Sequence, residues 1–531
     1  MRRALAVNAA VAAAAGLAAF PWTPGPLRMA GAASLLFVLP GIAWLGLFRG
    51  GPLSPVRLSL AIVGVASVSA VGALAAGTLV GPPPPPALLA VWTLVVVNLG
   101  LVVAGPWPRL DPEVRWGRLA VVAAAGFTIT SCAALYLVPP LEDHDMEVRG
   151  TAYGLVATGK PYFTSNRELY LPMSHPVLFN VLVAESLVAT GEIGAVRPSF
   201  ESARRAEAAA AEGRTFDWEA AWRRDYQAFL ATPALAGTRA PSAFFAALVL
   251  ALIADLVVRA TGRWEAAWGA CALYAAVPET VVRSAYAGYF GETVFGMLAA
   301  ATLLAEDDAP PWLFAAGAIM ALMDHKTVVF VLPVAAWLLG RSLLRRRVLD
   351  RRGLALVLGF GAGTAVWWGY GFWVDAHVFV EDHLRRHIAH RVLLNDVRLA
   401  ADPAHHYAPS IPQLWAEFAR HTGWLLVPLA AVAAVAALVR GDDATAALAV
   451  WFLAGAIAYS LTDWRQTKHL MNGLAPMVVL VAAWLAPRSR YRWAGVALAG
   501  LALALCLRGD VRLVRDFSTL RISGASDVDG W

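Results

Sequence analysis

The sequence has little charge and almost no cysteine. Asp, Glu, Lys and Arg make up 15% of its 531 residues, against about a quarter in a typical soluble domain. Hydrophobic residues make up 59%, and a chain this long and this apolar cannot cover its surface in water, so it needs a lipid bilayer as solvent. The three cysteines each lie in an apolar run and form no CxxC pair, which argues against a disulfide framework and against a thiolate metal site.

The net charge of +6 does not indicate a nucleic-acid partner. Most arginines stand at the ends of apolar runs, where arginine sets the topology of a membrane protein, and we find no nucleic-acid-binding motif. Met1, Arg2 and Arg3 before an Ala-rich run resemble a signal peptide, but because no convincing cleavage site follows, we expect a retained first helix. We therefore expect membrane lipids, and no nucleic acid, as partners.

Apolar runs predict an all-α, polytopic membrane protein with about 15 transmembrane helices. Two long polar regions, 139–240 and 375–420, interrupt these runs. Within the first region, 147–158 and 176–190 predict short helices at the membrane interface, each apolar on one side and polar on the other. The chain then divides into four parts. Residues 1–117 form a four-helix N-terminal module, 118–374 a membrane core that includes the loop 139–240, 375–420 an external histidine-rich loop, and 421–531 C-terminal helices with a short tail.

The arginines predict the orientation of the chain. The Ala-, Arg-, Gly- and Val-rich composition is typical of a high-GC bacterial genome, so we expect the bacterial plasma membrane. With the N-terminus in the cytoplasm, the arginine clusters fall on the cytoplasmic side along the whole chain, and only the turn 306–310 is acidic where arginine is expected. This orientation requires the chain to turn back at 324–326, because a single helix across that break would invert everything after it. The polar regions then share the extracytoplasmic face.

The densest group of candidate catalytic side chains follows the fifth apolar run. It comprises Glu142, Asp143, His144, Asp145 and Glu147, with Arg149 close behind. Acids in an outer loop are often only solvated. Beside a membrane cavity, a carboxylate can instead take a proton from a hydroxyl nucleophile or hold a divalent cation against a phosphate. The residues leave both interpretations open, and with them a dependence on Mg²⁺ or Mn²⁺.

The motif that begins with this cluster is familiar. Residues 143–162, Asp-His-Asp-Met-Glu-Val-Arg-Gly-Thr-Ala-Tyr-Gly-Leu-Val-Ala-Thr-Gly-Lys-Pro-Tyr, and residues 174–180, Ser-His-Pro-Val-Leu-Phe-Asn, resemble the first external loop of GT-C-type membrane glycosyltransferases. That group includes protein O-mannosyltransferases and lipid A aminoarabinose transferases. The resemblance covers about residues 118–374. The chain departs from the pattern in its Asp-His-Asp order, where Asp-Glu is common, and in the four helices before the core.

The resemblance implies a GT-C-like core whose large first external loop carries the catalytic carboxylate. This carboxylate would activate an acceptor hydroxyl for attack on the anomeric carbon of a polyprenyl-phosphate-linked sugar, with inversion. The Asp-His-Asp order leaves open whether Asp143 or Asp145 is the base, with Asp145 favoured. The loop that binds donor or acceptor would include His144, Glu147, Arg149 and His175. The sequence names neither the sugar nor the acceptor, which could be a protein, a lipid or a polysaccharide.

Two further places carry candidate side chains. Tyr289 and Glu292 fall at the next external turn, where the resemblance implies a supporting acid; Glu292 near a helix N-terminus would equally suit the helix dipole. Residues 324–326, Asp-His-Lys, interrupt apolar sequence at membrane depth, where charges are costly and usually functional. The resemblance implies that Lys326 offsets the donor phosphate charge, and His325 could bind a phosphate or a metal. Anchoring at the interface is the alternative.

Histidines and basic residues complete the set. His383, His387 and His390 follow the spacing i, i+4, i+7, which places them on one face of an α-helix. This spacing can bind metal, but the neighbouring arginines favour phosphate, and an amphipathic helix over the membrane is the plainer interpretation. Arg465 and Lys468 precede a later apolar run and could hold the donor phosphate or anchor the chain at the interface.

The pattern favours a membrane glycosyltransferase over a lipid or polysaccharide transporter and over a non-catalytic scaffold. A transporter carries charged or broken segments at mid-membrane, often in inverted repeats, and Asp255 is the main candidate for such a charge. A scaffold predicts no cavity around the acidic cluster. The glycosyltransferase predicts that Asp143 or Asp145, Glu292 and Lys326 line one outward cavity open to the lipid. The resemblance also implies that the loop 375–420 covers the substrates, so that it could act as a lid.

Overall fold

The computed structural model of the chain is helical throughout the part that it describes. This part comprises residues 2–48, 52–80, 85–138, 147–161, 175–201, 218–285, 290–306, 309–344, 350–393, 410–440, 442–461 and 467–486, with the single residues or pairs 205, 209, 212–213, 215, 288, 500 and 504. Eight of its helical segments are long and apolar enough to cross a membrane, or nine if a bent pair is one span. The chain is therefore a multi-pass membrane protein. The expectation of about 15 spans goes beyond this number and remains a prediction.

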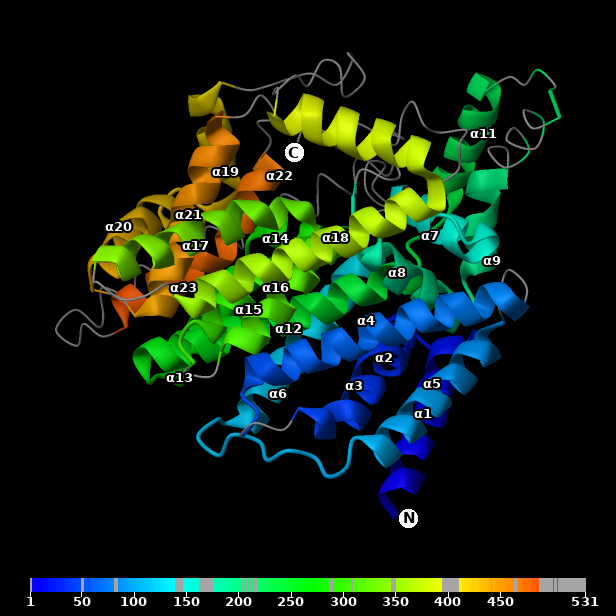
Figure 1. The fold of residues 1–531 in the computed structure, drawn as a ribbon, viewed down its shortest axis with the longest axis horizontal. Helices are drawn as coiled ribbons and strands as arrows, with labels where there is room; N and C mark the ends of the chain where they lie inside the picture. The colour runs from blue at the N-terminus through cyan, green and yellow to red at the C-terminus, as the bar shows by residue number, and fades with distance from the viewer. Residues whose placement is uncertain are drawn as a thin grey trace.

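The N-terminal part supplies four of these spans. Its helical segments are α1 (Arg2–Ala19), α2 (Gly25–Ala33), η1 (Ser34–Val38), α3 (Leu39–Trp44), η2 (Leu45–Leu47), α4 (Pro55–Val80), α5 (Pro86–Val103), α6 (Trp116–Cys132) and η3 (Ala133–Leu137). The segments from α2 to η2 form one continuous span, as do α6 and η3. Figure 1 shows these helices at one side of the molecule, with the N-terminus at the lower edge.

The remaining helices build the rest of the bundle. The middle of the chain forms α7 (Glu147–Thr158), α8 (Leu178–Ala189), α9 (Ile193–Val196), η6 (Arg197–Phe200), α11 (Trp218–Ala231), α12 (Ala236–Thr261), α13 (Trp264–Ala275), α14 (Pro278–Ala285) and α15 (Phe290–Leu303). The last part forms α16 (Pro310–Met323), η7 (His325–Thr327), α17 (Val328–Leu344), α18 (Arg351–Phe379), η8 (Val380–Leu393), α19 (Ile411–Thr422), α20 (Leu426–Arg440), α21 (Asp443–Leu461), α22 (Thr467–Leu470), η11 (Met471–Gly473) and α23 (Leu474–Leu485).

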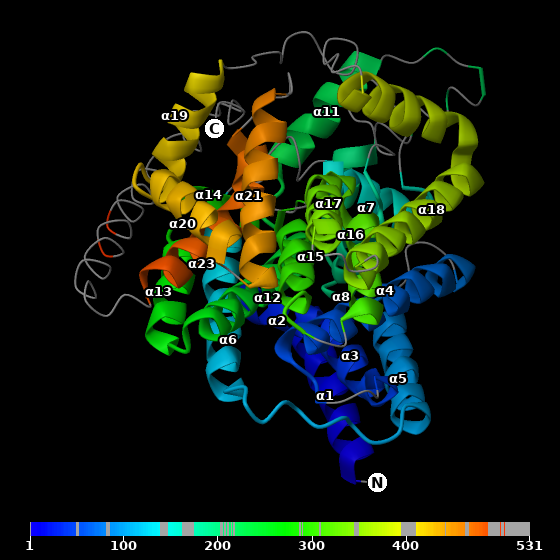
Figure 2. The ribbon, with the colours of Figure 1, turned by 60° about the vertical axis from the view of Figure 1, so that its left-hand side comes forward.

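Helix α12 is the centre of the packing. Almost every side chain from Ala236 to Val257 is buried, as expected for a helix that is apolar on all sides. It contacts α2, α6, α8, α13, α15 and α23, and Figures 1 and 2 show it in the middle of the bundle. Near its start, Phe244 stacks on Phe37 of η1 and Phe245 packs against Phe295 of α15. The N-terminal module is thus joined to the core through one continuous aromatic cluster.

Helices α16 and α18 pack with their backbones in contact and run in the same direction. Gly359 faces Phe314, and four residues further along both helices Gly363 faces Ala318. Because the pairing advances in the same sense on both helices, they are parallel. The start of α18 at Gly353 packs on Leu338 late in α17, so α17 runs the opposite way. The break at 324–326 is therefore a true turn between two helices, which confirms the arrangement that the arginines required.

Adding one methyl group at Gly359 is expected to destabilise this helix pair. A Cβ there would lie only 2.7 Å from the carbonyl carbon and 2.8 Å from the Cα of Phe314, and backbone cannot move aside as a side chain can. We expect Gly359→Ala to cost about 1–3 kcal/mol, the usual cost of overpacking, and to lower the midpoint of thermal unfolding in detergent. Gly361→Ala is the matched control, because no atom lies within 4 Å of a Cβ at that position. Equal midpoints for the two variants would contradict the close parallel packing.

The end of the bundle opposite the 324–326 turn carries a network of ion pairs. Glu306, just beyond α15, accepts from Arg57 at 2.6 Å and from Arg259 at 3.4 Å, and Arg259 also pairs with Asp255 at 2.8 Å. The one acidic turn that interrupted the arginine pattern is thus the counter-charge of two arginines from other helices.

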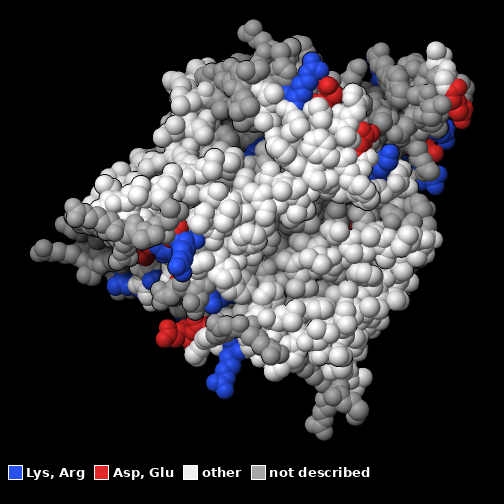
Figure 3. Space-filling model, in the orientation of Figure 1, with Lys and Arg blue, Asp and Glu red and all other residues white. Residues whose placement is uncertain are grey.

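A second group of ion pairs at this end joins α17, α18 and α21. Asp443 at the start of α21 pairs with Arg352 at 2.7 Å and with Arg341. Figure 3 shows a broad face with almost no charged side chains between charged groups at its lower left and upper right. Such a face suits contact with hydrocarbon.

Two short helices lie deeper than the sequence suggests. We expected 147–158 and 176–190 at the interface with one polar, wet side. Every side chain of α8 is buried, however, and α7 is buried from Val148 to Val156 except at Gly150. Both helices pack into the bundle, with α8 against α4, α5, α7 and α12. The apolar residues of α8 cover all its sides, and that pattern belongs to a core helix.

The chain folds over one end of the bundle after α18. The backbone of Asp375 departs from helical geometry at φ −163° and ψ 95°, which kinks α18, and the following segment η8 is a π-helix. In Figure 2, α18 bends at the upper right and η8 continues across the top. The side chain of His383 is described in this segment, whereas those of His387 and His390 lie outside the described residues. The expectation that the three histidines share a face therefore stays a prediction.

Candidate functional site

The turn between α16 and α17 is the centre of the candidate site. Helix α16 ends at Met323, and Asp324 takes an extended conformation. The Asp324 carboxylate accepts from the backbone N–H of Lys326 at 3.0 Å, and the Thr327 hydroxyl donates to the Asp324 carbonyl at 2.7 Å. An aspartate that caps the first turn of a new helix in this way fixes the direction of the chain. The same turn therefore presents three consecutive polar side chains, Asp324, His325 and Lys326.

Asp324 is an acid in the interior of the protein. Its side chain belongs to a residue only 2% exposed, and its second oxygen accepts from the Thr293 hydroxyl of α15 at 3.2 Å. Burial raises the pKa of this carboxyl above its ordinary value, although the charge of Lys326 and the two hydrogen bonds oppose the shift. The carboxylate is thus oriented by the helices on both sides.

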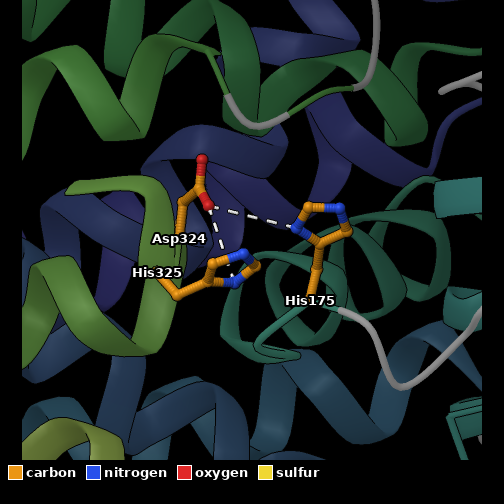
Figure 4. A group of neighbouring side chains, drawn as sticks. All are labelled: His175, Asp324 and His325. Atoms are coloured by element: carbon orange, nitrogen blue, oxygen red, sulfur yellow. Dashed lines mark ion pairs between the residues drawn. The ribbon is translucent and has the colours of Figure 1, made fainter. Parts of the chain in front are cut away.

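Two histidines face the same oxygen of Asp324. The Nδ1 atoms of His175 and of His325 each lie 3.9 Å from Asp324 Oδ1, and the two imidazole rings stack with centroids 5.2 Å apart. Figure 4 shows both rings turned toward the carboxylate, His175 from the segment before α8 and His325 from the start of η7. Ligand atoms of these three residues all lie within 4.8 Å of one another, which is a spacing that could hold a metal ion.

His383 reaches the same cluster from the segment that folds over the bundle. It is 1% exposed, its ring lies 5.9 Å from that of His325, and it stacks on Phe379 at 4.9 Å. The histidine-rich loop therefore contributes one ring to the site through η8. The side chain of His387 lies outside the described residues.

Glu292 approaches from α15. It stands in the first turn of that helix and is 1% exposed. Neither carboxylate oxygen hydrogen-bonds to a side chain in the described part of the chain, and the group interacts electrostatically with Asp324. Its position near a helix N-terminus fits the simple dipole interpretation, but complete burial beside a second acid makes a purely structural role costly.

Lys326 lines a narrow, largely apolar pocket. Its walls come from α15, α17, α19, α21, α22 and η11 and include Phe330, Trp415, Phe418, Trp451, Phe452, Tyr459, His469 and Asn472. Lys326 brings a positive charge and His469 a titratable ring to this mostly apolar lining. His469 stacks on Tyr459 with ring centroids 5.3 Å apart, and it follows Lys468 in α22, whose side chain lies outside the described residues.

The acidic segment itself lies outside the described residues, as do Tyr289 and Arg465. This applies to Asp143, His144 and Asp145. Hydrogen bonds fix the chain just before this segment to α12. Buried Arg239 donates to the carbonyl of Val138 at 2.7 Å and to that of Ala134.

The anchor at Val138 lies at the same end of the bundle as the turn. Gly291, next to Glu292, packs on Ser242 and Phe245, less than two turns after Arg239. The chain thus enters the acidic segment beside the start of α15. This is the end of the bundle at which the sequence predicts that the acids, Glu292 and Lys326 come together.

Glu147 and Arg149 are in α7, beyond the acidic segment. Glu147 is half-buried in the first turn. Arg149 is 1% exposed, donates to the carbonyl of Pro233 at 3.3 Å and places its guanidinium over the ring of Phe229 at 5.2 Å. These contacts hold α7 against α11, and the expectation that Arg149 belongs to the loop that binds donor or acceptor stays a prediction.

Sequence reasoning missed two parts of this site. Asp324 was treated only as part of the helix break, although an acid at membrane depth beside two polar neighbours is itself a signal. The sequence carried no signal for the pocket beside Lys326. Its walls come from segments up to about 175 positions apart, and each of them looks like an ordinary apolar helix.

Neither the models of known protein families nor the curated proteins match this chain. The resemblance of the first polar region to GT-C-type glycosyltransferases therefore stays a prediction.

Proposed function

We propose that the protein is a membrane glycosyltransferase of GT-C type. It moves a sugar from a polyprenyl-phosphate donor to an acceptor hydroxyl with inversion at the anomeric carbon. One observation carries the proposal: Lys326 lines a largely apolar pocket rich in aromatic side chains, and its neighbours Asp324 and His325 join His175 in a polar cluster at the same turn. A cation at an apolar pocket suits a ligand with a long apolar tail and an anionic head.

The proposed roles combine the described positions of Lys326, His469 and Glu292 with the roles that the resemblance implies for the other groups. The polyprenyl chain enters between α17, α19 and α21, and the phosphate stops at Lys326, whose charge offsets the negative charge that grows as the phosphate leaves. Arg465 and Lys468 add positive charge from the segment that leads into His469, which lines the same pocket. Asp145 or Asp143 acts as the general base on the acceptor hydroxyl, and Glu292 supports it from α15.

The orientation proposed from the arginines puts this site on the extracytoplasmic side of a bacterial plasma membrane. The ion-pair network around Glu306 and Asp443 then faces the cytoplasm, in keeping with the excess of arginine there. Acceptors on that outer side include proteins, lipids and polysaccharides of the cell envelope.

A lipid or polysaccharide transporter is the alternative. Its main sequence candidate, Asp255, is ion-paired with Arg259 beside Glu306, at the end of the bundle away from Lys326. A charge neutralised in this way fits a structural role better than a place on a transport path.

Transfer from a panel of labelled donors tests the proposal. The purified protein, in lipid nanodiscs, is incubated with polyprenyl-phosphate-linked hexoses and pentoses and with a cell-envelope extract as acceptor. We expect label to move from at least one lipid-linked donor, and none from the matching nucleotide sugars, which lack the apolar tail. Movement of the intact lipid across a vesicle membrane without sugar transfer would favour the transporter.

A further inference from the structure

The group formed by His175, Asp324 and His325 differs from an ordinary hydrogen-bonded triad. Both Nδ1 to Oδ1 distances are 3.9 Å, which is too long for a direct hydrogen bond. They are close to the spacing of atoms that share a metal ion: two ligands at 2.0–2.1 Å in tetrahedral geometry stand about 3.3 Å apart. Shortening each of the two distances by about 0.6 Å would bring both pairs to that value.

The surroundings of Asp324 match those of a metal ligand. The backbone of Lys326 and the hydroxyl of Thr293 already donate to its two oxygens. Hydrogen bonds of this kind orient a ligating carboxylate and are a regular part of metal sites. The stacked rings of His175 and His325 come from segments about 150 positions apart in the chain, and both converge on the same oxygen.

Glu292 is a buried acid beside the cluster, and a positive charge nearby would stabilise its carboxylate. Glu292 is completely buried, finds no hydrogen-bonding side chain among the described residues and repels Asp324. Two carboxylates buried together are unfavourable unless a proton or a cation offsets their charge. A divalent cation held by Asp324 would lie next to Glu292 and would offset that charge.

We propose that His175, Asp324 and His325 bind one divalent transition-metal ion of the Zn²⁺ type. Two imidazoles and one carboxylate suit Zn²⁺, Co²⁺ or Mn²⁺, whereas Mg²⁺ and Ca²⁺ prefer sites made of oxygen alone. Three protein ligands leave a position open, as in catalytic metal sites. If the proposed function holds, that position faces the donor phosphate at the turn that also carries Lys326; binding of the ion itself does not depend on that function.

Cobalt provides a direct test that needs no enzymatic activity. The full-length protein, stripped with a chelator in detergent, is titrated with Co²⁺ and its visible d–d absorption is recorded. We expect one Co²⁺ per chain, displaced by Zn²⁺. His175→Ala should weaken binding by about 100-fold or more, since even the loss of an outer partner of a metal ligand costs about 10–100-fold. His377→Ala, at an exposed histidine of α18, is the matched control and should bind as the unchanged protein does.

A second variant that keeps a metal ligand at position 175 distinguishes loss of the ligand from misfolding of the protein. In His175→Cys a thiolate replaces the imidazole, so Co²⁺ binding should return with the near-ultraviolet charge-transfer band of a cobalt–thiolate bond. Absence of stoichiometric Co²⁺ absorption, or equal affinities for His175→Ala and His377→Ala, would overturn the metal site. Tight Co²⁺ binding in a protein that transfers no sugar from any donor would support the metal site and contradict the proposed function.

Discussion

Replacing Asp143 and Asp145 together by alanine is expected to abolish sugar transfer while the protein still folds. A positioned general base contributes about 10²–10⁴-fold to a rate, and a double replacement leaves no neighbouring carboxylate in the pair to substitute for the lost one. The single variants Asp143→Asn and Asp145→Asn decide which acid is the base. We expect the larger loss in kcat for Asp145→Asn, measured with the best donor of the panel.

The control for this experiment is Glu212→Gln, an exposed acid in the same polar region. It should keep full turnover, because its charge is solvated and screened. The folded state of each variant is checked by its elution from a sizing column and by its unfolding midpoint in detergent. The flanks of the acidic segment are held by Arg239 and by α7, so the bundle should tolerate the change. Transfer that persists in the double variant would disprove the assignment of the base.

Lys326→Met is expected to lower kcat by about 10²–10³-fold, equivalent to about 3–4 kcal/mol of lost transition-state stabilisation. The lysine charge is needed most when the phosphate leaves, so kcat should fall more than the donor affinity. Lys326→Arg keeps the charge but changes its geometry, and we expect it to retain part of the rate. Methionine is a flexible apolar side chain that fits an aromatic lining, so the variant should remain folded.

The matched control is Lys160→Met, because the chain has only three lysines and Lys160 is exposed just after α7. Steady-state kinetics on both variants with the same donor separate kcat from KM. A change in KM alone for Lys326→Met would mean that the lysine only holds the donor in its ground state. Equal values of kcat and KM for the two variants would disprove the proposed role of Lys326 in sugar transfer.

Much of the architecture was predictable because lipid imposes strong rules on sequence. Apolar runs in hydrocarbon must be helical, and arginines at their ends gave a topology that required a turn at 324–326. The parallel packing of α16 and α18 confirms that turn. The acidic turn at Glu306 looked like an exception, since sequence cannot show that Arg57 and Arg259 meet it from other helices.

The candidate site was predictable only where charge stands against an apolar background. His325 and Lys326 were found for that reason, because buried charges are costly and rarely accidental. Glu292 and Arg149 were named through the resemblance instead, and the described contacts of Arg149 with Pro233 and Phe229 hold α7 against α11. The histidine spacing in 383–390 assumed an α-helix, whereas the segment after the kink at Asp375 is a π-helix.

The sequence by itself determined that this chain is a helical membrane protein and that its unusual polar residues interrupt apolar segments, because both properties depend on composition and local order. Only the tertiary structure decided which of those residues meet. His175 and Asp324 are about 150 positions apart, and their contact depends on how α8, α15 and α16 pack. The pocket beside Lys326 likewise exists only between helices, where no single stretch of sequence encodes it.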